Sequence, residues 1–108
     1  MKSYNSNKRE TNFYKKRMTN VILKRKGYKT TIKVIEMLLS SPFNNNEIAN
    51  TLGVDYNTVR YHLDLLVKNN LLMKDGDQYG TLYYPTIGLK ENLDTFKKLK
   101  DQQLIEKK

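Results

Sequence analysis

Between residues 44 and 69 the sequence carries start and stop signals for two short helices that follow each other closely. Asn44 and Glu47 have the spacing of a capping box, with Asn in place of Ser or Thr. Gly53 stands where a left-handed residue ends a helix, and Asp55 can cap the next helix. Two capped helices joined by a turn of only about three residues predict a helix-turn-helix.

The second helix of this pair, over about residues 56–69, has two chemically different faces. At about 100° per residue, Val59, Leu63 and Leu66 form the inner face, with His62 beside them. The outer face is polar: it consists of Asn57, Arg60, Tyr61, Asp64 and Lys68, with Thr58 on its flank and Tyr56 near its N-terminal edge. Arginine can bind guanine with two hydrogen bonds, asparagine can do the same with adenine, and tyrosine or threonine can contact a phosphate or a thymine methyl group. The outer face therefore suits the reading of base edges, whereas we expect His62 to be packed and hydrogen-bonded to the backbone.

Two short apolar runs follow this helix and flank a loop that contains glycine. Residues 71–74 and 81–85 lie on either side of an Asp-Gly pair and Gly80, which indicates a β-hairpin. A hairpin over residues 71–85, directly after a recognition helix, is a wing. We predict that Lys74 contacts a phosphate, and that Gln78 and Tyr79 at the tip contact the backbone or the minor groove.

The N-terminal segment, residues 1–29, is basic. Residues 1–11 are polar and are predicted to form a mobile arm. Residues 11–26 have helical spacing, with Tyr14, Met18 and Val21 on one face, and Gly27 is expected to end that helix.

The central segment, residues 30–86, holds the helix-turn-helix and the wing behind one further helix over about residues 30–40. The tail, residues 87–108, has a helical pattern with a short apolar seam formed by Leu89, Leu93, Phe96 and Leu99. Such a seam must be buried, either against the rest of the domain or against a second copy of the chain, and we favour the second copy, in a homodimer.

The net charge of +9 lies entirely in the first quarter of the chain, because residues 30–108 carry equal numbers of acidic and basic side chains. A basic block of this kind attracts a polyanion, which leaves open a nucleic acid, an anionic membrane or an acidic partner. Lys24, Arg25, Lys26 and Lys29 are the basic residues closest to the central segment, and we predict that they contact the DNA backbone.

Several classes of function are excluded or disfavoured by composition. The chain has no Cys and a single His, so thiolate metal sites, disulfides and Cys nucleophiles are excluded and we expect no metal or other cofactor. The Ser residues lie away from His62, and no phosphate-binding or dinucleotide motif occurs, so an enzyme is not expected. Apolar runs are too short for a membrane span, which predicts a cytoplasmic protein without a membrane partner.

A family resemblance rests on four pieces of sequence. These are Glu47-Ile48-Ala49, Leu52-Gly53, Thr58-Val59-Arg60-Tyr61-His62-Leu63 and Leu71-Leu72. Over about residues 30–86 the chain resembles the winged helix-turn-helix regulators of the ArsR type, especially their archaeal relatives. The resemblance implies a three-helix core with a wing, DNA binding through residues 56–68, and a homodimer. Family members that sense metals use clusters of Cys and His, which this chain lacks, so that function is not carried over.

We therefore predict a mainly α-helical protein with a small β-hairpin, a winged helix-turn-helix with additional N- and C-terminal helices. Its predicted function is that of a sequence-specific regulator of transcription that binds double-stranded DNA. Two alternatives stay open: a winged-helix module that binds protein, and a binder of RNA or single-stranded DNA. Tyr79, Tyr83 and Tyr84 cluster near the wing and would supply the stacking surface that the second alternative needs.

Overall fold

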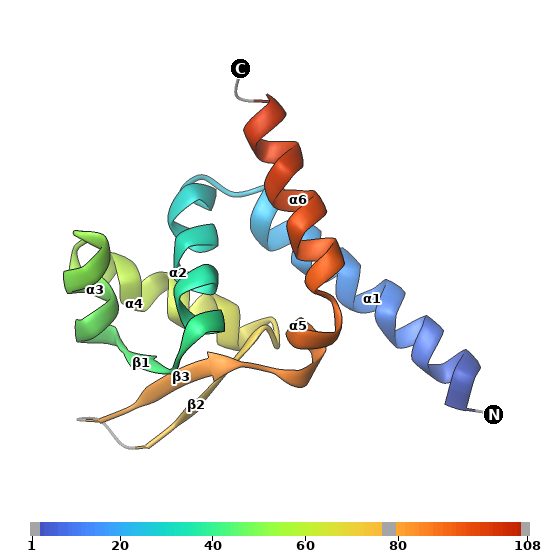
Figure 1. Cartoon of the computed structure of the whole chain (residues 1–108), viewed down its shortest axis with the longest axis horizontal. Coiled ribbons are helices and arrows are strands. Elements are labelled where there is room, and N and C mark those ends of the chain that lie inside the picture. The colour runs from blue at the N-terminus through green and yellow to red at the C-terminus, as the bar shows by residue number, and fades with distance from the viewer. Residues whose placement is uncertain (1–2, 77–79, 107–108) are drawn as a thin grey trace.

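The computed structural model describes residues 3–76 and 80–106, and the side chains of residues 13–76 and 80–103. Its elements are, in order, α1 (Ser3–Leu23), α2 (Tyr28–Ser40), β1 (Phe43–Asn44), α3 (Asn45–Leu52), α4 (Tyr56–Lys68), β2 (Leu72–Asp75), β3 (Leu82–Pro85), α5 (Ile87–Glu91) and α6 (Leu93–Glu106). Helices α2, α3 and α4 form one group above the sheet, and α1 and α6 lie beside each other on the other side of α2 (Figure 1). The predicted fold class, mainly helical with a small antiparallel sheet, is confirmed.

The helix-turn-helix forms where its local signals predict it. The Asn44 side chain accepts a hydrogen bond from the Glu47 backbone N–H at 2.8 Å, and the Glu47 carboxylate accepts one from the Asn44 N–H at 2.9 Å. Gly53 has φ 66° and ends α3 in the left-handed conformation that glycine adopts without steric cost. Asp55 caps α4, so both helices begin with a satisfied N-terminus.

The wing is a hairpin of β2 and β3, and the sheet order is β1-β3-β2 with all strands antiparallel. Leu72 pairs with Pro85 and Asp75 with Leu82, which confirms the predicted hairpin. The sequence did not predict β1, a strand of two residues in which Phe43 pairs with Tyr83. This strand joins the start of α3 to β3, so one sheet connects the helix-turn-helix to the hairpin.

One hydrophobic cluster holds these elements together. Its fully or nearly fully buried side chains come from every helix and from the hairpin: Met18, Val21, Ile22, Ile32, Val34, Ile35, Leu38, Ile48, Ala49, Val59, Leu63, Leu66, Leu71, Leu72, Tyr83, Leu89, Phe96 and Leu99. Three of them belong to α1, so the C-terminal half of that helix is part of the core.

The prediction for the N-terminal segment was wrong at both of its ends. The helix begins at Ser3, whereas its start was predicted at about residue 11, after a polar arm. It ends at Leu23, and Gly27 lies beyond it, at the N-cap of α2. Gly27 has φ 77°, and its left-handed backbone redirects the chain into α2.

The tail forms two helices, and its apolar seam is buried within the chain. Asn92 ends α5, donating from its side chain to the Gly88 carbonyl at 2.8 Å, and α6 follows at once. Helix α6 packs along α1, and Phe96 and Leu99 are buried there. Gln103 donates to the Ile22 carbonyl at the end of α1, at 3.1 Å. Since α1 of the same chain covers this seam, the favoured alternative of a second copy was wrong, and the other alternative, burial against the rest of the chain, holds.

Tyr14 connects α1 to the root of the wing. Its hydroxyl donates to the Asn70 carbonyl at 3.1 Å and lies 3.3 Å from the Thr86 hydroxyl. Thr86 in turn donates to the same carbonyl at 2.8 Å and accepts from the Leu89 N–H as the cap of α5. Gly88 makes room for the ring, because a Cβ there would lie 2.9 Å from Tyr14 Cε1.

Candidate nucleic-acid interface

The outer face of α4 is open to solvent. The Asp55 carboxylate accepts hydrogen bonds from the N–H groups of Asn57 and Thr58, at 2.9 and 3.2 Å, which fixes the start of the helix. Val59, Leu63 and Leu66 are fully buried and fix its rotation about its axis. All seven side chains predicted for the outer face are exposed: Tyr56, Asn57, Thr58, Arg60, Tyr61, Asp64 and Lys68.

Arg60 and Asp64 form an ion pair along this face. The Arg60 Nε donates to Asp64 Oδ1 at 3.3 Å, and about half of each side chain is exposed. The negative charge of Asp64 raises the pKa of Arg60, so the guanidinium stays charged at every accessible pH. Tyr56 and the buried Tyr83 of the wing are close enough to act on the same guanidinium. The pair therefore lies on the part of α4 that is near Tyr83 of β3.

The basic turn, which we define as Lys24, Arg25, Lys26 and Lys29, lies against α4. All four side chains are exposed. The Arg25 guanidinium donates to the Tyr61 hydroxyl at 3.2 Å. Residues distant in sequence are thus brought to one surface, which consists of the outer face of α4 and the basic turn.

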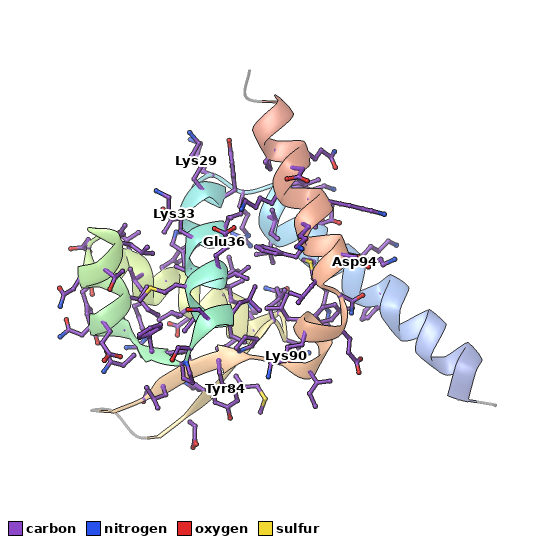
Figure 2. The ribbon with its side chains drawn as sticks, in the orientation of Figure 1. Lys29, Lys33, Glu36, Tyr84, Lys90 and Asp94 are labelled. Atoms are coloured by element: carbon purple, nitrogen blue, oxygen red, sulfur yellow. The ribbon has the colours of Figure 1, made fainter. Side chains whose placement is uncertain are left out.

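Lys33 extends the basic turn, and the sequence analysis did not single it out. It is exposed and lies one helical turn after Lys29 on α2. Figure 2 shows both lysines on the end of α2 that is remote from the sheet. The spacing of four residues was the signal that could have identified it.

His62 lies beneath the basic turn. It is buried, its Nδ1 is 3.0 Å from the Thr31 hydroxyl, and a Cβ on Gly27 would lie 3.3 Å from its ring. Burial lowers the pKa of His62, so the ring is neutral at pH 7. The prediction of a packed histidine agrees with this geometry, but its partner is the side chain of Thr31 on α2 and not the backbone. Within residues 3–76 and 80–106, no three His, Cys, Asp or Glu residues are grouped so that they could hold a metal ion.

Of the three predicted wing contacts, the structure describes Lys74. Lys74 is exposed on β2 and pairs with Tyr83 of β3. Gln78 and Tyr79, the predicted tip contacts, lie outside the described residues. Tyr83 is only 3% exposed and Tyr84 is partly buried, so Tyr83 offers no open ring on which a base could stack. Tyr83 therefore gives no support to the single-strand alternative.

Comparison with known proteins identifies shared architecture. No protein-family model and no curated protein sequence matches the chain. A solution structure of the homodimeric winged helix-turn-helix DNA-binding domain, fragment 1–100, of Mb0332 from Mycobacterium bovis, a possible ArsR-family transcriptional regulator, matches with a TM-score of 0.67. That match has 13% identity and covers 90% of this chain and 87% of that one.

Two HlyU structures are also similar. The transcriptional regulator HlyU from Vibrio vulnificus has a TM-score of 0.57 and 13% identity, over 97% of this chain and 98% of that one. HlyU from Vibrio cholerae has a TM-score of 0.59 and 19% identity, over 73% and 87%. These three proteins are bacterial and give no support to the archaeal part of the resemblance. In the part of the chain that the structure describes, no helix has the length and apolar character needed to cross a bilayer. The order of elements, the capped helix-turn-helix and these similarities together show that the chain has the winged helix-turn-helix fold.

Proposed function

We propose that this protein is a sequence-specific regulator of transcription that inserts α4 into the major groove of double-stranded DNA. The observation that carries the proposal is the open polar face of α4, which has the wing on one side and the basic turn on the other. The similar structures described as DNA-binding or transcriptional regulators support it.

The dimensions and chemistry of α4 fit this role. A helix of 13 residues is about 20 Å long, and the major groove, about 12 Å wide, admits one helix. The groove presents hydrogen-bond donors and acceptors that differ for each base pair. Asn57, Arg60 and Asp64 offer an amide, a guanidinium and a carboxylate along one face, and these groups can distinguish base pairs.

The basic turn supplies the contact to phosphates in this proposal. Lys24, Arg25, Lys26 and Lys29 all lie in solvent, and Arg25 is held beside α4 by Tyr61. Lys74 on β2 adds a cation at the wing. Phosphate contacts fix the position of a protein on the duplex and carry most of the salt dependence of binding.

We further propose that the protein acts as a homodimer, because a single recognition helix reads only a short site and two copies would read two half-sites. The domain from Mycobacterium bovis is homodimeric. The apolar seam of α6 is already buried against α1, so the contact between copies must use other sides of these helices or another surface.

The proposal is tested by selecting duplexes from a randomised pool and titrating the selected duplex with salt, with the molecular mass measured in parallel. Arg60→Ala is expected to weaken binding by about 1–3 kcal/mol and to relax the preference at one base pair. Lys98→Ala, which removes a positive charge from the exposed side of α6, serves as the control and should leave the preference unchanged.

Three results would contradict the proposal. One is a pool without enrichment, and another is equal binding by Arg60→Ala and the wild type. The third is tighter binding to single strands or RNA than to any duplex, which would instead favour the single-strand alternative.

A further inference from the structure

We propose that Asp64 is a positioning residue that holds Arg60 for the recognition of a guanine, so that the two side chains read a G·C pair as one unit. The inference rests on the proposed function and adds a chemical requirement on the target: a G·C pair opposite the middle of α4. It begins from a feature that attraction to phosphates does not explain, a carboxylate in the centre of the reading face.

Asp64 is the only acidic residue within α4. A carboxylate close to a duplex is repelled by the phosphates, so its presence on this face requires a reason. Helix stability is a weak reason, since an exposed ion pair four residues apart contributes little to the stability of a helix. Arg60 and Asp64 form such an exposed pair, because about half of each side chain is in solvent.

The atoms that form the pair suggest a stronger reason. Arg60 uses Nε, the nitrogen within its chain, to bind Asp64 Oδ1 at 3.3 Å. A guanidinium has five N–H donors, and when Nε is occupied the four on its two terminal nitrogens can still form a fork. The contact with Asp64 therefore restrains the plane of the guanidinium and leaves the terminal fork for another partner.

Guanine is the base that matches this fork. In the major groove it presents two neighbouring acceptors, O6 and N7, and arginine binds both at once. Holding a flexible side chain in its bound geometry lowers the entropic cost of that contact. Asp64 has a second oxygen, Oδ2, which can accept from the amino group of a cytosine, the one base edge in the groove that offers only a donor. Arg60 and Asp64 together thus favour a G·C pair, and a base that presents a hydrogen-bond acceptor to Asp64 is disfavoured.

The test compares Asp64→Ala and Asp64→Asn in the full chain. Discrimination between G·C and A·T at each position of the selected duplex is measured together with affinity for a non-specific duplex. Asp64→Ala should reduce discrimination at one position by about tenfold, while its affinity for non-specific DNA rises because a negative charge is removed. Asp64→Asn keeps an oxygen that can accept from Nε, so it should retain most of the discrimination and show the same rise in non-specific affinity.

Glu91→Ala is the matched control, because it removes the same charge from an exposed position at the end of α5. It should leave discrimination unchanged. If Asp64→Ala keeps full discrimination, or if it loses affinity for all duplexes in parallel with a loss of helix content, the carboxylate only stabilises the helix and the inference is wrong. Failure of the wild type to prefer any duplex would instead contradict the proposed function, so the two failures are distinguishable.

Discussion

At the scale of single residues, His62 links the stability of the fold to pH. Burial lowers its pKa below 6.5 in the folded chain, whereas in the unfolded chain the pKa returns to about 6.5. The unfolded chain therefore binds more protons as the pH falls through this range, and the free energy of unfolding decreases. The contribution of His62 is fully present above about pH 6.5 and is lost as the pH falls through the lower folded-state value.

Urea denaturation between about pH 7.5 and pH 5 measures this effect. We expect the wild type to lose stability over that range and His62→Asn, whose amide can replace Nδ1 beside Thr31, to lose less. If the free energy of unfolding of the variant falls with pH as steeply as that of the wild type, the pH dependence comes from other groups.

Gly27 and Gly53 separate the cost of a backbone conformation from the cost of a close contact. Both have positive φ, 77° and 66°, but a Cβ on Gly53 would meet no atom within 4 Å, whereas one on Gly27 would lie 3.3 Å from His62. Gly53→Ala should cost about 1–2 kcal/mol in the free energy of unfolding. Gly27→Ala should cost more, and the difference measures the packing of the turn on His62. Equal losses in urea denaturation would mean that the turn moves away without strain.

At the scale of elements, the apolar seam between α1 and α6 is expected to be buried within one chain, and its stability can test this. Phe96 is only 3% exposed, and Phe96→Ala should lower the free energy of unfolding by about 3 kcal/mol or more. Because the seam lies within one chain, the loss should be the same at low and high protein concentration. A loss that shrinks as the concentration rises would place the seam between two chains instead.

The sequence predicts the elements whose signals are local, and it fails where the deciding contact is distant. The capping box of Asn44 and Glu47 and the left-handed Gly53 are satisfied within a few residues, so α3 and its turn could be predicted. The two-residue strand β1 forms only because β3 lies beside it. Periodicity identified the apolar side of α6 but could not tell which surface covers it, since α1 and a second copy both meet the same requirement.

In the candidate site, too, the features set by local signals could be predicted and the contact between distant residues could not. Helical periodicity and the Asp55 cap were sufficient to orient α4, so all seven outer-face side chains are exposed as predicted. The contact between Arg25 and Tyr61 joins residues 36 positions apart and depends on the packing of the turn over His62. No pattern within either segment indicates that contact.

At the scale of the whole molecule, the uneven charge predicts where the salt dependence of the proposed DNA binding arises. Lys24, Lys26 and Lys29 changed together to Gln should reduce the slope of log K against log salt by about 0.9 for each phosphate that the variant no longer neutralises. Lys90, Lys97 and Lys98 changed to Gln remove the same charge from exposed positions on α5 and α6 and should change the slope less. Equal changes would show that total charge, and not the basic turn, attracts the duplex.

Substitution is the suitable experiment here, and deletion is not. Removal of residues 1–29 is the simpler way to remove the basic block, but Met18, Val21 and Ile22 are buried in the core. A truncated chain would lose stability together with its charge, and a weaker affinity for DNA could not then be assigned to electrostatics.

The hydrogen bonds of Tyr14 give the wing a fixed point in a helix that precedes it by more than fifty residues. The two ends of the hairpin meet at the Asn70 carbonyl and the Thr86 hydroxyl, and one phenol contacts both. A change in the position of α1 would therefore be transmitted directly to the base of the hairpin through this one hydroxyl group. If two chains associate through α1, the angle between their hairpins is determined at that junction, far from any base.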